Sequence, residues 1–152
     1  WGGWSEATRA LSTVRLPGRF HQSPPYLFDV AHNPDGARVL ARTIDHVRPP
    51  APIVALLCVL ADKDWRGMME ALAPVVSTFV LTNAPTAPES RGWVLEEVLA
   101  WAQARGWEVV AEGDFDRALE VARGRGETVL VTGSFHTVGD AMHRLQVDPL
   151  AG

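Results

Sequence analysis

A carboxylate, an imidazole and a carboxamide stand close together in the segment Asp29-Val30-Ala31-His32-Asn33-Pro34. Asp29 ends an apolar run and Pro34 favours a first helical turn, so the segment is expected to form a strand-to-helix corner. Such a corner can hold a ribose or a phosphate, because carboxylates bind diols and a helix N-terminus offers free amides to anions. There His32 can bind phosphate or move a proton. The alternative is structural: Asn33 caps the helix, Asp29 binds nearby amides and His32 is a satisfied loop histidine.

Three further polar residues stand where they can bind charged groups. Arg19 follows a Pro17-Gly18 turn, and a guanidinium there can bind a phosphate or carboxylate through two parallel hydrogen bonds. Lys63 stands between two aspartates directly after a long apolar run, where an ammonium can hold a substrate carboxylate. Ser134 follows the last apolar run and offers a hydroxyl together with the amides of a helix start. Each has a structural alternative, since most exposed arginines are only solvated and serine is a favoured N-cap.

The elements that must position these residues alternate along the chain. Short apolar runs with strand character are followed by longer segments at helical spacing, which is typical of βαβ units and a mostly parallel sheet. We expect strands at residues 26–30, 53–60, 78–82, 108–111 and 128–132, and helices at 34–47, 64–72, 93–105, 114–123 and 137–145. The first 25 residues can add one antiparallel edge strand. The fold class is therefore α/β, with about six strands flanked by about five helices.

The carboxyl edge of this sheet is the place to look for a site. Residues 53–60 are continuously apolar, as in a central strand that is covered on both faces. Ligands of open α/β sheets bind at the carboxyl ends of the strands, where the polar residues described above lie. We expect Arg19, Asp29 and His32 to line a shared cleft there.

Composition narrows the class of protein. The 152 residues suit one domain, and the net charge of -4 lacks the basic excess of nucleic-acid binders. We therefore do not expect nucleic acid as a partner. No apolar stretch is long enough to span a membrane, so we do not expect a membrane as a partner either. Cys58 has no second thiol to pair with, which points to a reducing cytoplasm. The first residue is Trp1 rather than Met, so we expect a fragment of a longer chain.

Two kinds of motif are missing from the sequence. There is no Gly-x-x-x-x-Gly-Lys-Ser/Thr loop, so the chain cannot itself supply a P-loop for ATP phosphates. The five histidines show no metal-binding spacing such as His-Glu-x-x-His, and we assign no metal ligand to this chain.

Taken in order, the motifs resemble a known family. The ordered set is Leu16-Pro17-Gly18-Arg19-Phe20, Phe28-Asp29-Val30-Ala31-His32-Asn33-Pro34, Leu60-Ala61-Asp62-Lys63-Asp64 and Val131-Thr132-Gly133-Ser134-Phe135. It resembles the C-terminal domain of the folylpolyglutamate synthase/dihydrofolate synthase family, in the Mur ligase superfamily, over essentially the whole chain. The resemblance implies a Rossmann-like domain that joins an N-terminal P-loop ATPase domain, absent here, with the active site between the two domains.

The resemblance also implies an activity and site roles. ATP phosphorylates a carboxylate of folate or dihydropteroate, and the amine of L-glutamate attacks the acyl phosphate, with Mg²⁺ held mainly by the absent domain. Arg19, Asp29 and Asn33 would bind ATP, and His32 would act catalytically beside the phosphates. By a looser match, Lys63 and Ser134 would bind glutamate.

Departures and alternatives accompany this resemblance. The family often has Gly where this chain has Val30, and commonly Pro-Arg-Ala near Ser90-Arg91-Gly92. Another Mur-type amino-acid ligase would share most of these features, although the histidine at position 32 favours the folate branch. A non-catalytic module that binds a nucleotide or an amino acid is the alternative from a different class.

Overall fold

The structure, a computed structural model, describes residues 18–148. Within this range the chain forms a six-stranded sheet in the order β1-β2-β6-β3-β4-β5. The strands are β1 (His21–Ser23), β2 (Tyr26–Asp29), β3 (Ile53–Leu57), β4 (Thr78–Leu81), β5 (Val109–Ala111) and β6 (Thr128–Thr132). Only the β1–β2 pair is antiparallel among these strands, which confirms the expected edge strand. Leu16 and Pro17 of the first motif lie outside the described residues.

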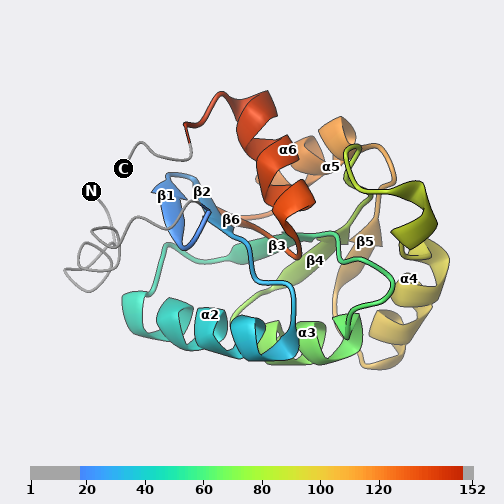
Figure 1. The fold of residues 1–152 in the computed structure, drawn as a ribbon. Helices are drawn as coiled ribbons and strands as arrows, with labels where there is room; N and C mark the ends of the chain where they lie inside the picture. Colours follow the sequence, from blue (N-terminus) through green and yellow to red (C-terminus); the bar gives the residue numbers. More distant parts are fainter. Residues whose placement is uncertain (1–17, 149–152) are drawn as a thin grey trace.

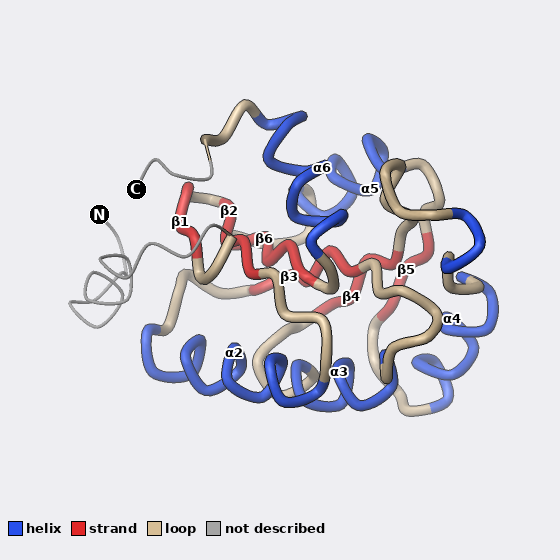
Figure 2. The backbone as a smooth tube through the Cα atoms, in the orientation of Figure 1, coloured by secondary structure: helices blue, strands red, loops and turns tan. Residues whose placement is uncertain are grey.

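Helices cover both faces of the sheet. They are α2 (Pro34–Val47), α3 (Trp65–Leu72), α4 (Leu95–Ala104), α5 (Phe115–Arg123) and α6 (Phe135–Leu145), with a short 3₁₀ turn η1 (Glu89–Arg91). Figure 1 shows α2 and α3 along one face, α5 and α6 on the other, and α4 near β5. Figure 2 shows the strands as one continuous layer between these helices. The α/β fold class expected from the sequence is confirmed, and none of the described helices could cross a bilayer.

The core lies along the two central strands. Every residue of β3 and of β6 is buried, and each strand pairs on both sides with parallel neighbours. Such strands are apolar on both faces because helices pack on both sides of the sheet. Placing the apolar run that begins at Ile53 in the middle of the sheet was therefore correct.

Strand β3 ends at Leu57, three residues earlier than expected. Leu57 pairs with Leu81 and Thr132, the last residues of the two neighbouring strands, so the ladder has no further partners. Cys58 remains buried, but its carbonyl accepts a hydrogen bond from the Thr137 hydroxyl of α6 at 2.9 Å. Periodicity alone cannot distinguish a buried strand from the buried turn that continues it.

The helices begin where polar caps satisfy their first amides. The side chains of Asn33, Asp64 and Ser134 accept hydrogen bonds from Gly36, Gly67 and Thr137, respectively. Because Ser134 is the cap, α6 begins at Phe135, two residues before the expected start. Helix α4 begins at Leu95 and not at residue 93, since the buried Trp93 indole donates to the Thr82 carbonyl at 2.9 Å.

Candidate functional site

Three hollows open near the carboxyl ends of the strands, and each is named here after one residue. The Arg19 hollow, about 120 Å³, is lined by Arg19, Phe20, Asp29, Gly36, Val39, Leu40 and Thr43. The Lys63 hollow, about 220 Å³, is lined by His32, Leu60, Lys63, Arg91, Gly133, Ser134, Phe135 and His136. The Cys58 hollow, about 540 Å³, lies between the loop after β4 and the start of α5. All six residues selected from the sequence lie in or beside the first two.

Asp29 is buried at the end of β2 and binds two backbone amides. Its Oδ1 accepts a hydrogen bond from the Phe20 amide at 2.8 Å, and its Oδ2 accepts one from the Ala31 amide at 3.0 Å. Burial raises the pKa of the Asp29 carboxyl, while the two amides and the nearby Arg19 charge partly offset that rise. Asp29 therefore joins the segment before β1 to the strand-to-helix corner.

Arg19 is exposed on the segment that Asp29 holds in place. Gly18 has φ +73°, and a Cβ there would lie 2.7 Å from the Val30 side chain, so the position requires glycine. The Gly18 carbonyl also accepts a hydrogen bond from the Val30 amide at 2.8 Å. The guanidinium is therefore presented from a segment fixed at Gly18 and at Phe20.

His32 lies in a different hollow from Arg19 and Asp29. Its Nδ1 is 3.2 Å from the Val30 carbonyl, which can only accept a hydrogen bond, so Nδ1 carries a proton. The ring lies 5.8 Å from that of Phe135, and both line the Lys63 hollow. The expectation of one cleft shared by Arg19, Asp29 and His32 is therefore wrong for this domain. Two adjacent hollows replace it, because the turn after Asp29 directs His32 toward β6.

Asn33 caps helix α2, which is the structural alternative that the sequence analysis left open for this residue. Its Oδ1 accepts a hydrogen bond from the Gly36 amide at 2.7 Å, and the residue is exposed. Asn33 thus sets the start of α2, between the two hollows that Arg19 and His32 line. Its side-chain oxygen is used by the helix, which leaves the amide NH₂ group for any ligand.

The Lys63 hollow is basic. Lys63 and Arg91 both line it, together with His32 and His136. Arg91 forms a salt bridge with Asp62 at 3.0 Å, and its hydrogen bond lowers the pKa of that exposed carboxyl. Among the described residues, no side chain forms a salt bridge with Lys63. The hollow thus holds one ammonium without a salt-bridge partner in the described part of the chain, although its charge also acts on the neighbouring Asp62 carboxylate.

Ser134 and Gly133 form the β6 side of the Lys63 hollow. The buried Ser134 Oγ accepts a hydrogen bond from the Thr137 amide at 3.1 Å and lies 2.9 Å from the Thr137 hydroxyl. Gly133 has φ +120°, and a Cβ there would lie 2.3 Å from the Cys58 carbonyl oxygen. The chain therefore passes close to β3 here and turns into α6, which directs the N-terminus of that helix toward the hollow.

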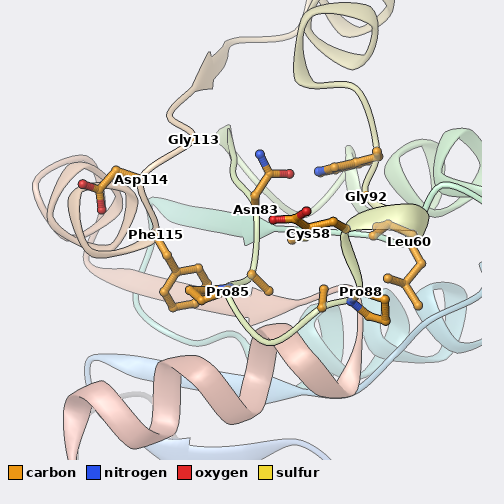
Figure 3. A pocket seen from close by; sticks show the side chains of 14 residues that line it. Cys58, Leu60, Asn83, Pro85, Pro88, Gly92, Gly113, Asp114 and Phe115 are labelled. Atoms are coloured by element: carbon orange, nitrogen blue, oxygen red, sulfur yellow. The ribbon is translucent and has the colours of Figure 1, made fainter.

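The Cys58 hollow is lined by acidic side chains, whereas the Lys63 hollow is lined by basic ones. Figure 3 shows Asp114 and Phe115 on one side of the view, Leu60 and Pro88 on the other, and Asn83 between them. Its charged lining residues are Glu89 and Asp114, without a lysine or arginine. Cys58 is buried, which raises the pKa of its thiol. An anionic ligand is therefore favoured in the Lys63 hollow and disfavoured here.

Sequence reasoning missed two residues of the Lys63 hollow. Arg91 was noted only as a departure from the family pattern. His136 follows the last expected strand, but neither residue was assigned a role. They come from a loop and a helix that are distant in sequence, so spacing alone could not bring them together. Among the described residues, no group of three His, Cys, Asp or Glu side chains could hold a metal ion.

The chain is similar to known proteins over most of its length. Residues 18–135 match the family described as Mur ligase, glutamate ligase domain. The dihydrofolate synthase/folylpolyglutamate synthase of Escherichia coli K12 is 35% identical over 136 residues, which cover 87% of this chain and 31% of that protein. The chain thus spans about a third of that relative.

Solved structures show the same fold. A Mycobacterium tuberculosis folylpolyglutamate synthase complexed with ADP and AMPPCP matches with a TM-score of 0.77 and 33% identity, over 88% of this chain and 33% of that one. A bifunctional folylpolyglutamate synthase/dihydrofolate synthase from Yersinia pestis, complexed with AMPPNP and Mn ion, matches with a TM-score of 0.72 and 30% identity, over 87% and 32%. With the family match to residues 18–135, these likenesses show that the chain belongs to the glutamate ligase domain family of the Mur ligases.

Proposed function

We propose that this chain is the C-terminal domain of an ATP-dependent ligase that adds L-glutamate to a carboxylate of folate or dihydropteroate. The observation that carries the proposal is the basic Lys63 hollow at the carboxyl edge of the sheet. Glutamate brings two carboxylates, and this hollow combines the Lys63 ammonium with the N-terminus of α6. The folate-enzyme relatives support the choice of glutamate as the amino acid.

The proposed reaction has two steps. The γ-phosphoryl group of ATP is transferred to an oxygen of the acceptor carboxylate, which gives an acyl phosphate and ADP. The glutamate nitrogen, after losing a proton from its ammonium form, attacks the carbonyl carbon. Its new C–N bond replaces the C–O bond to phosphate, and inorganic phosphate leaves. The domain contributes by binding and orienting the reactants, an effect that can supply a large part of such a rate enhancement.

The Arg19 hollow fits one side of a nucleotide. Arg19 is exposed and suits a phosphate or ribose oxygen as a donor, while Val39 offers an exposed apolar surface beside it. Both Asp29 oxygens already bind amides, so Asp29 acts on a nucleotide mainly by holding the segment that carries Arg19. Asn33 contributes by starting α2 between the two hollows. Divalent metal and the phosphates would be held mainly by a P-loop domain in the rest of the protein.

The Lys63 hollow fits the incoming amino acid. Lys63 would pair with one glutamate carboxylate, and the Ser134 corner would offer the amides of α6 to the other. The protonated Nδ1 of His32 binds the Val30 carbonyl, which leaves Nε2 for a phosphate or a proton. His32 lines the Lys63 hollow and follows Asp29 of the Arg19 hollow by three residues, so we assign it to the transferring group. An ATP-dependent enzyme with a single buried thiol suits the cytoplasm.

The test is glutamate addition by the full-length enzyme, followed by product mass and phosphate release. Dihydropteroate, reduced folate and a peptidoglycan precursor are offered separately as acceptors. We expect turnover with at least one of the first two, and a decrease of at least about tenfold in Asp29→Ala, equivalent to roughly 1.4 kcal/mol of transition-state stabilisation. Turnover with the peptidoglycan precursor alone would assign the chain to another Mur-type ligase.

The isolated chain provides the second arm of this test. We expect it to fold, to bind ATP weakly and to form no product, since it contains no P-loop. Titration calorimetry with ATP and Mg²⁺ measures the affinity. Sub-micromolar binding, or product from the isolated chain, would refute the two-domain proposal.

A further inference from the structure

We propose that Asp140 is a positioning residue for the Lys63 hollow, and that it acts by holding the loop after β4 against α6. This inference rests on the proposed function, which makes the hollow the glutamate pocket. Asp140 is 5% exposed, although aspartate is seldom buried without a partner. Among the described residues, no cation forms a salt bridge with its carboxylate.

The partner of Asp140 is Thr86, which is 54 positions away along the chain. One carboxylate oxygen, Oδ2, accepts hydrogen bonds from the Thr86 amide and from the Thr86 hydroxyl, each at 3.0 Å. Hydrogen bonds to an ionised acceptor are stronger than those between neutral groups. A two-point bond of this kind fixes Thr86 in position and orientation relative to α6.

The loop that Thr86 belongs to lies over two hollows. It joins β4 to α4. Residues 83–85 and 87–89 of this loop line the Cys58 hollow, while Arg91 lines the Lys63 hollow. On the far side of the loop, the Arg91 carbonyl accepts a hydrogen bond from the Ala61 amide at 2.8 Å, and its guanidinium pairs with Asp62. The loop is therefore attached near Arg91 on one side and at Thr86 on the other.

Helix α6 supplies the opposite wall of the Lys63 hollow. Ser134 caps this helix, and His136 stands four residues before Asp140, on the same helical face. The His136 Nδ1 lies 3.4 Å from the Thr86 hydroxyl oxygen, whose proton is donated to Asp140. The hydroxyl therefore acts as acceptor toward His136. The contact between Asp140 and Thr86 thus sets the separation between Arg91 on the loop and Ser134 and His136 on the helix.

The kinetic test uses Asp140→Ala and Thr86→Val in the full-length enzyme. Alanine suits a helix and valine has the shape of threonine, so both variants are expected to fold. Each should raise the KM for glutamate about fivefold or more and leave the KM for ATP within about twofold. Thr86→Ser, which retains both donors, should stay within about twofold of wild type for both substrates. Asp45→Ala, on the exposed face of α2, is the matched control and should change neither.

Amide hydrogen exchange at Thr86 supplies a readout that does not depend on activity. Its amide is bound to Asp140, so Asp140→Ala should accelerate exchange there about tenfold or more, while Asp45→Ala leaves it unchanged. Unchanged exchange would overturn the proposed contact. Faster exchange with an unchanged KM for glutamate, or with equal rises in both KM values, would overturn the positioning role. A wild-type enzyme that adds no glutamate would refute the proposed function itself, which distinguishes the two failures.

Discussion

The Arg19 hollow and the Lys63 hollow lie at the same edge of the sheet, yet their polar side chains differ in what they bind. In the Arg19 hollow the carboxylate is buried and fully engaged by backbone amides, and one exposed guanidinium remains for a ligand. In the Lys63 hollow several basic side chains face the same space, and the serine is the group engaged by backbone. Each hollow therefore combines a buried cap or clamp with a cation that forms no salt bridge within the described residues, an exposed one in the Arg19 hollow and a half-buried one in the Lys63 hollow.

The comparison separates two uses of polar residues at strand ends. Asp29, Asn33 and Ser134 bind amides of their own loops and helices, so their loss should first weaken the fold. Arg19 and Lys63 form no salt bridge within the described residues, so their loss should first weaken ligand binding. The predictions below test that division, beginning with the largest expected effect.

Gly133→Ala tests how closely the segments that follow the two central strands, β3 and β6, approach beside the Lys63 hollow. The added Cβ would lie 2.3 Å from the Cys58 oxygen at a residue with φ +120°, so we expect a loss of about 3 kcal/mol in the free energy of unfolding. Urea denaturation of the chain measures the loss. The control is Gly139→Ala, where a Cβ meets nothing within 4 Å and helix propensity favours alanine. Equal stability of the two variants would contradict the close approach.

Asp29→Ala tests the clamp of the Arg19 hollow. Two buried amides would lose their acceptor, and we expect the free energy of unfolding to fall by about 2–3 kcal/mol. Denaturant unfolding measures the change, with the exposed Asp45→Ala expected to stay within about 0.5 kcal/mol of wild type. If Asp29→Ala had the same free energy of unfolding as Asp45→Ala, the two hydrogen bonds of Asp29 would not contribute to stability and the prediction would be contradicted.

Ser134→Ala tests the corresponding cap of the Lys63 hollow. Loss of an N-cap hydroxyl typically costs about 1 kcal/mol, so the effect should be smaller than that of Asp29→Ala. Ser134→Asp keeps an acceptor at the cap and should retain more stability than the alanine variant in the same urea titration. A larger loss in the free energy of unfolding for Ser134→Ala than for Asp29→Ala would contradict the prediction that the Asp29 clamp contributes more than the Ser134 cap.

The pH dependence of stability sharpens the comparison further. The unfolded Asp29 carboxyl ionises near 3.8, and burial raises its pKa in the folded chain. Above 3.8 the folded chain therefore binds more protons than the unfolded chain, and the free energy of unfolding falls as pH rises through the folded pKa. Asp62, whose pKa is lowered by Arg91, acts in the opposite direction below 3.8. The contribution of Asp29 is isolated by subtracting the free energy of unfolding of Asp29→Asn from that of wild type at each pH. This difference should fall as pH rises above 3.8, and a difference that does not change with pH would contradict the raised pKa.

Much of the fold could be predicted from the sequence, because local patterns determine it. The apolar runs located five strands, and Pro34 marked the start of α2 correctly. The end of β3 could not be predicted, since it depends on where the neighbouring strands stop. The cap at Ser134 was recognised as a structural alternative, but the expected helix still began two residues too late.

The candidate site was only partly accessible from the sequence. The polar residues after each strand were found because parallel strands bring their carboxyl ends to one edge. Their division between two hollows was not found, since it depends on the direction of the turn after Asp29. The pairs Arg91–Asp62 and Thr86–Asp140 join residues 29 and 54 positions apart, and no local spacing indicates such contacts.

The most direct test of the central claim is a comparison of Arg19→Ala with Lys63→Ala in the full-length enzyme. KM for ATP and KM for glutamate are measured for each variant under the same conditions. The account predicts that Arg19→Ala raises mainly the KM for ATP, and that Lys63→Ala raises mainly the KM for glutamate, each by about tenfold. Equal changes in both constants for both variants, or no change in either, would contradict the assignment of one hollow to the nucleotide and the other to the amino acid.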